Sequence, residues 1–587
     1  MNKLCQKGFA FLLACLAAAI PAHAVDYTWT GLSTTDFNTA ENWDPEGVPN
    51  SSDDAAVIQD GVSDLGTSNT VSTLTLGGGS TSGTINLNSG GNLTASQVIQ
   101  SGTGTGTVNF NGGTITASAA STDFLSGTAN YIYYGGATVD TQNYNVTIST
   151  ALANSTGSTG GSVNPGGGLT KQGAGKLTLT GMNSYAGATT ISAGVLQADD
   201  GVGLPASSLL CLDGGVLQSN SSVFSFSRNL GTSGGDFQWT TNGGGFSNGG
   251  TGTWNISVNG GGTLYWGDGQ ADVGSKIVGT LKLSSPYATG AVTIKNNIDL
   301  GDSDRTIEVN NTDTGGTHCG TLTGTITGTG GIIKNGPGRL MMNGNNCLYT
   351  GTTTLNEGFF ANYASHQPTG NYVVNGGTMC FCGNSPDSIA GLKVTGGEVE
   401  GLGGSILRSK TDYDIQGGEL YGITLTNYDS IVVGLTKTGD TVATLECTCT
   451  YTGPTTISEG TLVLSTTTDD KYTGQISTSS LIENNATFLI DDTKTHIVGT
   501  ISGTGTTQLI DGAQLTATSI TQDTLSIGAV TKLTIATMVG GSTSATDSLS
   551  PVPEPGTLVL LATAGLAVLL TIGCGKMPTS SVFPRRG

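Results

Sequence analysis

The sequence predicts an all-β, elongated and repetitive protein, and three observations support this fold class. Glycine supplies 94 of the 587 residues and only 11% of residues are charged, which is too few for an ordinary globular surface. Val, Ile and Leu alternate with Thr, Ser and Asn through most of the chain, which is the period-two pattern of half-buried strands. A longer unit also recurs along the chain, as repeat architectures require.

The recurring unit has three copies, at residues 169–197, 332–360 and 435–464. All three keep a lysine near the start, then a tyrosine, then Thr-Thr followed by Ile or Leu and a glycine. The third copy replaces a Gly-Ala-Gly turn and one core leucine at 440–443, so we expect its local geometry to deviate.

This unit resembles the autotransporter-associated β-strand repeat of bacterial surface proteins. The resemblance implies an elongated, right-handed parallel β-helix, which is a solenoid of stacked turns. Within the first copy, alternation should turn Leu177 and Leu179 inward and Lys176 and Thr178 outward, with glycines at the corners. One copy cannot bury its core alone, so neighbouring turns are needed. Weaker ladders of the same kind occur at 74–76, 84–87, 107–110, 114–116 and 515–520.

The whole chain divides into four expected segments. These are a signal peptide at 1–24, an N-terminal cap at 25–60, a solenoid body at 61–548 and a sorting signal at 549–587. With about 20 to 25 residues a turn, the body predicts about 20 to 24 turns and a rod about 100 Å long. Trp29 and Trp43 fall in the cap, and a tryptophan-lined sugar site is the alternative for them.

The N-terminus is typical of a secretory signal. Lys3 and Lys7 precede an apolar run, which ends in Ala22-His23-Ala24. A basic region, an apolar region and small residues at Ala22 and Ala24 predict cleavage after Ala24. A lipoprotein cleavage site at Cys15 is the alternative, although apolar residues continue after it.

The C-terminus carries a proline motif, an uncharged segment at 556–575 and a basic tail. As a helix, that segment spans about 30 Å, the thickness of a bilayer core. The basic tail then predicts a cytoplasmic C-terminus with the body outside. A buried core helix is the alternative. The motif is Val552, Pro553, Glu554 and Pro555, and the basic residues are Lys576, Arg585 and Arg586.

This arrangement resembles the PEP-CTERM sorting signal, a domain also catalogued as an ice-binding protein C-terminus. The resemblance implies a partner, the exosortase, which is a membrane cysteine protease-transpeptidase that removes the helix during delivery to the surface. The stretch at 577–584 is longer than is usual in this family. The implied location is therefore membrane-anchored after export, and then the cell surface or extracellular space.

The net charge and the few histidines of the chain indicate which classes of function to expect. With 42 acidic against 21 basic residues, the surface should repel nucleic acid, so we expect no nucleic-acid partner. A polysaccharide-degrading β-helix enzyme needs clustered Asp, His and Lys or Arg. Outside the signal, His318, His366 and His496 are scattered, and we interpret them as surface or turn residues. We expect no enzyme, no cofactor and no metal, with loops 267–272 and 301–304 as plain turns rather than calcium sites.

The cysteines suggest two close pairs. Cys380/Cys382 and Cys447/Cys449 are Cys-x-Cys pairs, whose Cα atoms on one strand would lie about 6.5 to 7 Å apart, near the upper limit for a disulfide. Stacking of cysteines between neighbouring turns is the alternative. Without Cys-x-x-Cys pairs or a nearby histidine, we expect no zinc site.

These observations predict a structural or adhesive protein of the cell surface or extracellular matrix, associated with exopolysaccharide or biofilm. A carbohydrate-binding or ice-binding face is the first alternative, built from threonines such as Thr73, Thr75 and those at 352–354. A β-helix enzyme that degrades polysaccharide is the second.

Overall fold

The computed structural model describes residues 24–155, 166–220, 224–312, 316–344, 347–364, 369–383, 386–510, 512–529 and 531–535. The predicted signal residue Ala22 lies outside this part of the chain, as do Val552, Pro553, Glu554, Pro555, Lys576, Arg585 and Arg586. Ala24 is the first residue described and is exposed. Within the described ranges, no helix is both long and apolar enough to span a bilayer.

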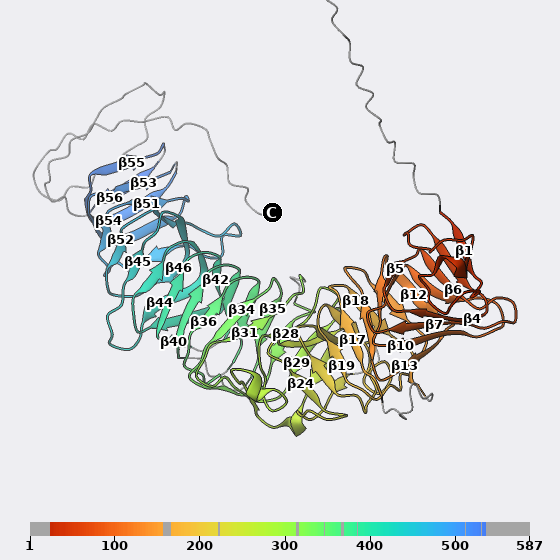
Figure 1. Ribbon diagram of the computed structural model, residues 1–587. Helices are drawn as coiled ribbons and strands as arrows, with labels where there is room; N and C mark the ends of the chain where they lie inside the picture. The colour runs from red at the N-terminus through yellow and green to blue at the C-terminus, as the bar shows by residue number, and fades with distance from the viewer. Residues whose placement is uncertain are drawn as a thin grey trace, which may run out of the picture.

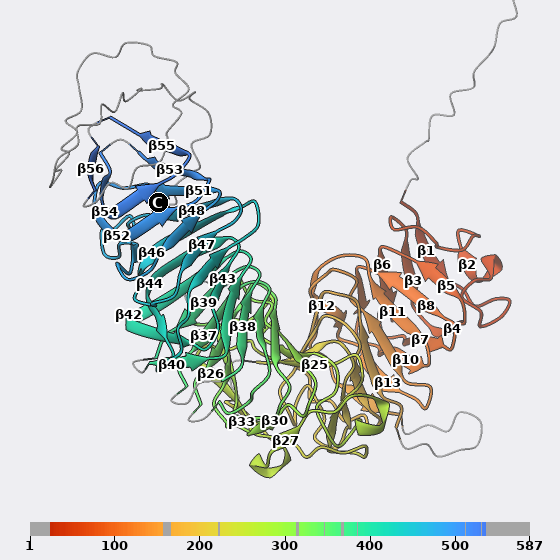
Figure 2. The same cartoon turned by 90° about the vertical axis from the view of Figure 1, so that its left-hand side faces the viewer.

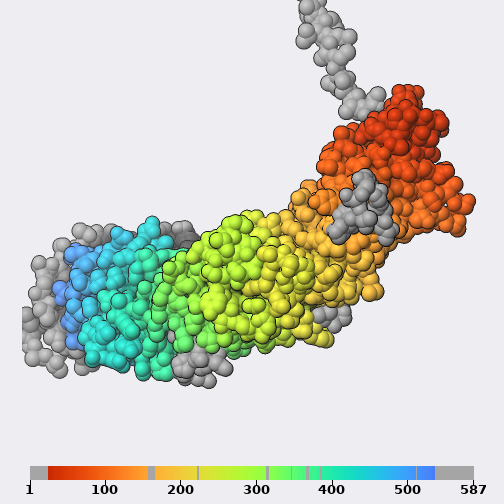
Figure 3. All heavy atoms as spheres, turned by 60° about the horizontal axis from the view of Figure 1, so that its bottom comes forward, coloured from red at the N-terminus to blue at the C-terminus, as the bar shows by residue number. Residues whose placement is uncertain are grey.

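The chain coils into a parallel β-solenoid of about 21 turns, as the sequence predicted. Figures 1 and 2 show an elongated, curved body with β1 (Asp26–Trp29) at one end and β56 (Lys532–Ile535) at the other. The space-filling view in Figure 3 shows the same elongated form. Among the described strands, every pairing is parallel except that of β1 with β2 (Trp43–Asp44).

A long sheet of 24 strands runs the length of the body, from β1 and β3 (Ala55–Ile58) to β54 (Gln514–Thr521) and β56. An eight-stranded sheet and a five-stranded sheet form the other faces of the N-terminal part. The strands of the eight-stranded sheet are β5 (Ser68–Thr70), β8 (Asn92–Ala95), β11 (Thr114–Ala117), β14 (Ala137–Asp140), β17 (Leu169–Gln172), β19 (Thr189–Ile191), β21 (Leu210–Leu212) and β24 (Phe237–Trp239). The five-stranded sheet consists of β4 (Gly61–Leu65), β7 (Gly83–Asn88), β10 (Gly106–Asn111), β13 (Ala129–Ile132) and β16 (Leu152–Asn154).

A 16-stranded sheet, here called the C-terminal sheet, forms a second long face in the rest of the body, beside a three-stranded sheet of β27 (Leu264–Tyr265), β30 (Ile298–Asp299) and β33 (Ile326–Thr327). Its strands that matter below are β26 (Thr253–Ile256), β29 (Ala291–Ile294), β32 (Gly320–Leu322), β35 (Arg339–Met342), β37 (Phe359–Asn362), β39 (Thr378–Phe381), β42 (Glu398–Ser409), β44 (Gly418–Asn427) and β46 (Val442–Cys449). Three short 3-10 helices lie in the described loops, at Ala40–Asn42, Asn259–Gly261 and Gln270–Asp272.

The predicted alternation of side chains is confirmed. In β18 (Lys176–Leu179) both leucines are buried and the two intervening side chains are half-buried. The same alternation holds in most strands, because successive side chains of a strand point to opposite faces. The inward residues form one continuous hydrophobic core from Trp29 to Leu533.

The third copy keeps the register of the first, but its altered stretch lies in a longer strand, because β46 runs from Val442 to Cys449 and the equivalent β18 only from Lys176 to Leu179. Its strand β45 (Leu435–Lys437) pairs with β47 (Thr455–Ile457) in the register Leu435–Thr455, which matches Leu169–Thr189 of the first copy. Ala443 occupies the buried position of the missing leucine. A smaller inward side chain is therefore accepted without a change of register.

Candidate functional site

An open groove of about 770 Å³ lies on the C-terminal sheet. It lies over β26, β29, β32 and β35 and is rich in threonine. Its threonines are Thr251, Thr253, Thr289, Thr293, Thr317, Thr321 and Thr323, and its other described lining residues are Gly252, Ala291, Lys295, Gly316, His318, Cys319, Met341 and Asn343.

Parallel register builds this groove. Thr293 lies opposite Thr321 on the next turn, and Thr321 lies opposite Met341 on the turn after that. Thr293 and Thr321 are buried and form the floor, whereas Thr251 and Thr253 are exposed at the rim. Thr293 and Thr321 are therefore two hydroxyl groups one strand spacing apart, about 4.8 Å, with Asn255 before them and Met341 after them in the same column.

The charge of the groove differs from that of the protein. None of its described lining residues is acidic, although the chain has 42 acidic residues. Lys295 is exposed in it and His318 is half-buried beside it. The groove therefore offers hydroxyl donors and acceptors together with a cation, which suits a hydroxyl-rich ligand that carries negative charge.

A second threonine array lies on the eight-stranded sheet. Thr114, Thr138, Thr170 and Thr190 are directly opposite one another on four successive turns. All four are half-buried, and Asn92 precedes them in the same column. The column is a straight row of hydroxyl groups on the outer face of the sheet.

The threonine arrays suggested by the sequence are wrong. Thr73 lies between Ala55 and Gln97, and Thr75 lies between Val57 and Ile99, so neither stacks on another threonine. In the second candidate, Thr353 is buried and its hydroxyl faces that of Tyr349, while the neighbours of Thr354 are Ile333 and Val373. Consecutive threonines alternate between core and solvent, so a run of them does not make one face.

The tryptophans near the N-terminus are buried. Trp29 is 6% exposed and Trp43 is 2% exposed, with ring centroids 5.0 Å apart in edge-to-face contact. The indole nitrogen of Trp43 donates to the carbonyl oxygen of Phe37 at 2.7 Å. The alternative of a tryptophan-lined sugar site is wrong, because neither ring presents a face to solvent.

A buried lysine in each repeat was missed by the sequence reasoning. The Lys171 ammonium donates to the carbonyl oxygens of Gln172, Gly173 and Ala193 at 2.8, 2.7 and 3.1 Å, and the side chain is fully buried. Lys334 and Lys437 repeat this arrangement, each with three carbonyl acceptors. The recurrence of this lysine in all three copies was the feature of the sequence that could have indicated its role.

Three carbonyl oxygens match the three donors of an ammonium group. Burial lowers the pKa of Lys171 to about 7, and the Asp140 carboxylate acts in the opposite direction. Burial likewise lowers the pKa of Lys334 to about 8, opposed by Glu357 and Glu308. These lysines lie at corners and hold the backbone, so their role is structural rather than ligand binding.

Each repeat also buries a tyrosine hydroxyl against a threonine hydroxyl. The two oxygens lie 2.7 Å apart in Tyr185–Thr189 and in Tyr349–Thr353, and 2.8 Å apart in Tyr451–Thr455. Burial raises the pKa of all three phenols, so they stay protonated. In the first and third copies a serine of the next turn, Ser208 or Ser480, extends the network.

His496 is not a surface or turn residue, contrary to the expectation. It lies in β52 (Thr495–Ser502) and is fully buried, with Nε2 2.7 Å from Asp492 and Nδ1 2.8 Å from the Gly474 carbonyl oxygen. Burial acts to raise the pKa of Asp492, but hydrogen bonds from His496 and Thr466 hold it below its usual value. Asp492 is half-buried, so the pair reaches solvent only through the carboxylate. His366 lies outside the described residues.

The acidic loops considered as calcium sites have basic partners. Asp268 pairs with Arg305 at 2.6 Å, and Asp272 pairs with Lys276 at 2.8 Å. In the second loop, Asp304 accepts the Gly331 amide at 2.8 Å. Hydrogen bonds and ion pairs of this kind occupy the carboxylate oxygens that a calcium ion would need.

The cysteines give one disulfide in the described chain. Cys380 and Cys382 are bonded, with Cα atoms 5.3 Å apart, which is closer than the estimate for an extended strand. Cys447 and Cys449, also two residues apart, are free and buried. Cys211, Cys319 and Cys347 are likewise free and buried.

Fold, repeats and open polar faces define a passenger-like β-solenoid. The three copies match the family Passenger-associated-transport-repeat at residues 169–198, 332–360 and 435–464, which confirms the predicted repeats. The chain is also 30% identical over 243 residues to an adhesin, the BmaC autotransporter of Brucella suis biovar 1 (strain 1330). That similarity covers 32% of this chain and 7% of the relative's length. No solved structure matches significantly.

Proposed function

We propose that this chain is a non-enzymatic, surface-displayed protein whose solenoid binds polysaccharide in the threonine groove. The observation that supports this most is the groove itself, which is lined by seven threonines and the exposed Lys295 and has no acidic residue among its described lining. Similarity to passenger repeats and to an adhesin supports the surface and adhesive parts of the proposal.

The ligand class follows from the chemistry of the groove. Threonine hydroxyls both donate and accept hydrogen bonds, as sugar hydroxyls do. Lys295 would pair with a carboxylate or sulfate of the polymer, and its attraction would weaken at high salt. We therefore propose an acidic exopolysaccharide, as in a biofilm matrix. Cleavage of the polymer is not proposed, because the groove lacks the acidic residues that glycoside hydrolysis uses among its described lining.

The route to the surface is part of the same proposal. A signal peptide ending at Ala22-His23-Ala24 would direct export, and the right-handed solenoid would then fold outside. Residues 556–575 would anchor the chain in the membrane, with Lys576, Arg585 and Arg586 on the cytoplasmic side. An exosortase would act at the Val552-Pro553-Glu554-Pro555 motif. Mass spectrometry should find a mature chain that begins at Val25 and ends near Glu554.

The groove is tested with the full-length chain and purified acidic polysaccharides. Lys295→Ala and the double variant Thr251→Val/Thr253→Val should each weaken binding at least about tenfold, which corresponds to about 1.4 kcal/mol. Thr354→Val, on the long sheet, should bind as the unmodified protein does. Equal binding by all variants would show that the groove is not the binding site. Depolymerisation of the polysaccharide by the protein would contradict the non-enzymatic assignment.

The threonine column on the eight-stranded sheet supports a second candidate, a carbohydrate-binding or ice-binding face. Thr114, Thr138, Thr170 and Thr190 form a straight row whose spacing can match ordered water or sugar hydroxyls. Thermal hysteresis that is lost in Thr138→Lys would support ice binding. A glycan-array signal lost in the same variant, with no thermal hysteresis, would support sugar binding at this face.

A further inference from the structure

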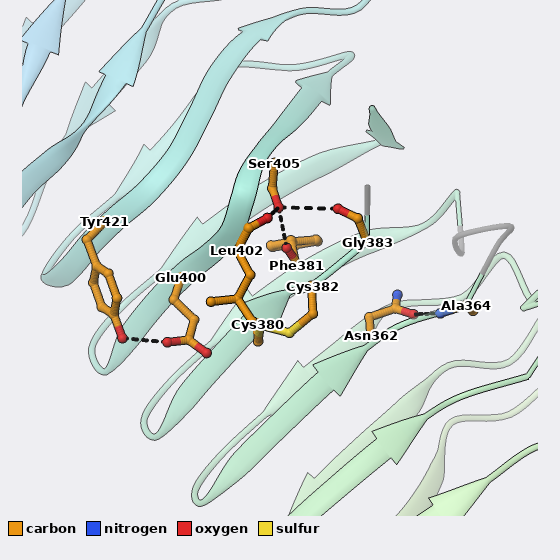
Figure 4. The surroundings of a disulfide bond; sticks show 10 residues. All are labelled: Asn362, Ala364, Cys380, Phe381, Cys382, Gly383, Glu400, Leu402, Ser405 and Tyr421. Atoms are coloured by element: carbon orange, nitrogen blue, oxygen red, sulfur yellow. Dashed lines mark hydrogen bonds between the residues drawn. A yellow bond between two sulfur atoms is a disulfide. The ribbon is translucent and has the colours of Figure 1, made fainter. Parts of the chain in front are cut away.

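The surroundings of the Cys380–Cys382 disulfide include a carboxylate at ligand distance. One atom each from Cys380, Cys382 and Glu400 lie within 4.8 Å of one another. Figure 4 shows Glu400 between the disulfide and Tyr421. The register explains this, because Cys380 on β39 lies directly opposite Glu400 on β42, and Glu400 lies opposite Tyr421 on β44.

The carboxylate is oriented by its neighbour. The Tyr421 hydroxyl donates to Oε2 of Glu400 at 2.7 Å. This hydrogen bond holds one carboxylate oxygen and leaves the other to bind a metal ion, and such hydrogen bonds orient the side chains that ligate metals. Ser405 holds the adjoining chain by donating to the Phe381 carbonyl oxygen at 2.6 Å.

We propose that, when reduced, this cluster is a zinc-class metal site with Cys380, Cys382 and Glu400 as ligands. Zinc in tetrahedral sites has bonds of about 2.0 to 2.3 Å to oxygen and sulfur, so its ligand atoms are about 3.5 to 3.8 Å apart. In the structure one atom of each side chain lies within 4.8 Å of the others, and after reduction the two sulfurs would separate to this spacing. Water would take the fourth position, because Cys382 and Glu400 lie at the edge of the buried region.

The oxidation state controls the site. In the disulfide neither sulfur is a thiolate, and thiolates are the metal ligands. A dithiol reductant transfers two electrons and two protons, breaks the S–S bond and becomes a disulfide itself. Zinc binding then releases the two thiol protons and forms two Zn–S bonds and one Zn–O bond. Reduction therefore precedes metal binding, and a bound metal ion keeps the two sulfurs from forming the disulfide again.

Cys447 and Cys449 form a second Cys-x-Cys pair with which the proposed metal site can be compared. They have the same spacing on β46 of the same sheet, but both are buried and free. No third ligand joins them in the described part of the chain, where the Cys380, Cys382 and Glu400 group is the single one of its kind. The proposal therefore predicts metal binding at one Cys-x-Cys pair and none at the other.

The test uses the full-length chain, reduced with a phosphine and then titrated with Cd²⁺ or Zn²⁺. We expect one ion per chain, an ultraviolet thiolate-to-Cd²⁺ charge-transfer band, and no band in the oxidised protein. Cys380→Ser/Cys382→Ser should lose the band, while Cys447→Ser/Cys449→Ser should keep it. Circular dichroism checks that each variant is folded.

The carboxylate is tested separately. Glu400→Gln should weaken metal affinity about 10- to 100-fold, and Tyr421→Phe about tenfold, whereas Glu419→Gln on the adjacent column should leave it unchanged. Equal affinity of Glu400→Gln and Glu419→Gln would overturn the proposal. So would a band that survives in Cys380→Ser/Cys382→Ser, or equal metal binding by the oxidised chain.

Discussion

The ammonium nitrogen of Lys171 lies 3.1 Å from the carbonyl oxygen of Ala193, at the equivalent corner of the next turn of the solenoid. The same contact joins Lys334 to Glu357 at 3.2 Å and Lys437 to Glu459 at 3.1 Å. Since each lysine also bonds two carbonyl oxygens of its own corner, the side chain ties successive turns together where strands are absent. This contact explains why the repeat keeps a lysine at an inward position.

Lys171→Met should destabilise the first repeat by about 2 kcal/mol, because the carbonyl oxygens of Gly173 and Ala193 lose the ammonium donor. The Gln172 carbonyl oxygen keeps its hydrogen bonds from Thr141. Hydrogen exchange should show the loss locally, at β17 and β19, since a solenoid turn interacts mainly with its neighbours. Lys295→Met, at an exposed position, is the control and should leave exchange unchanged. Similar exchange in both variants would show that the corner contacts contribute nothing.

Thr189→Val should cost more stability than Thr353→Val. The Thr189 hydroxyl lies between those of Tyr185 and Ser208, so its removal leaves two buried hydroxyl groups short of a partner. Thr353 contacts the Tyr349 hydroxyl, and the position that corresponds to Ser208 is Gly370. We expect a difference of about 1 kcal/mol between the two variants in denaturant titration. Equal losses would contradict the role assigned to the serine.

Asp387 should make stability depend on pH. The side chain is 2% exposed, its Oδ2 atom has no hydrogen-bond partner, and burial raises its pKa to about 7. The folded state therefore holds a proton that the unfolded state loses near pH 4, so stability should fall between about pH 4 and pH 7. Asp387→Asn should remove this dependence, which amounts to roughly 4 kcal/mol for a pKa raised from 3.8 to about 7. Asp302→Asn, in an exposed turn, is the control for thermal melts across this range.

The all-β fold and the inward leucines were predictable because alternation is local. The register between neighbouring turns could not be predicted, because loops of unequal length separate the strands. The column Thr138, Thr170 and Thr190 depends on which residues meet after each loop, and no periodicity in the sequence specifies that. For the same reason the sequence suggested arrays at Thr73 and Thr75, whose real neighbours are not threonines.

Buried charged side chains were the second feature that could not be predicted from the sequence. General rules place lysine outside, so Lys171 was interpreted no further, although its recurrence in each repeat marked it. Glu400 had no sequence signal at all, because its proximity to Cys380 comes from pairing between turns. The groove was missed for a similar reason, since its floor joins Thr293 to Thr321 across two strands.

Trp43→Ala should open the N-terminal end of the stack. Trp43 contacts Trp29 and Phe37 with ring centroids 5.0 and 4.8 Å apart, and its strand pairs with β1. Removing so large a buried side chain costs about 3 to 5 kcal/mol, enough to release β1 from β3. The freed strand edge would then pair with other chains. Sedimentation velocity should show concentration-dependent association, and Trp43→Phe should show less. A monomeric Trp43→Ala with β1 amides still protected would mean that the aromatic cluster does not guard this end.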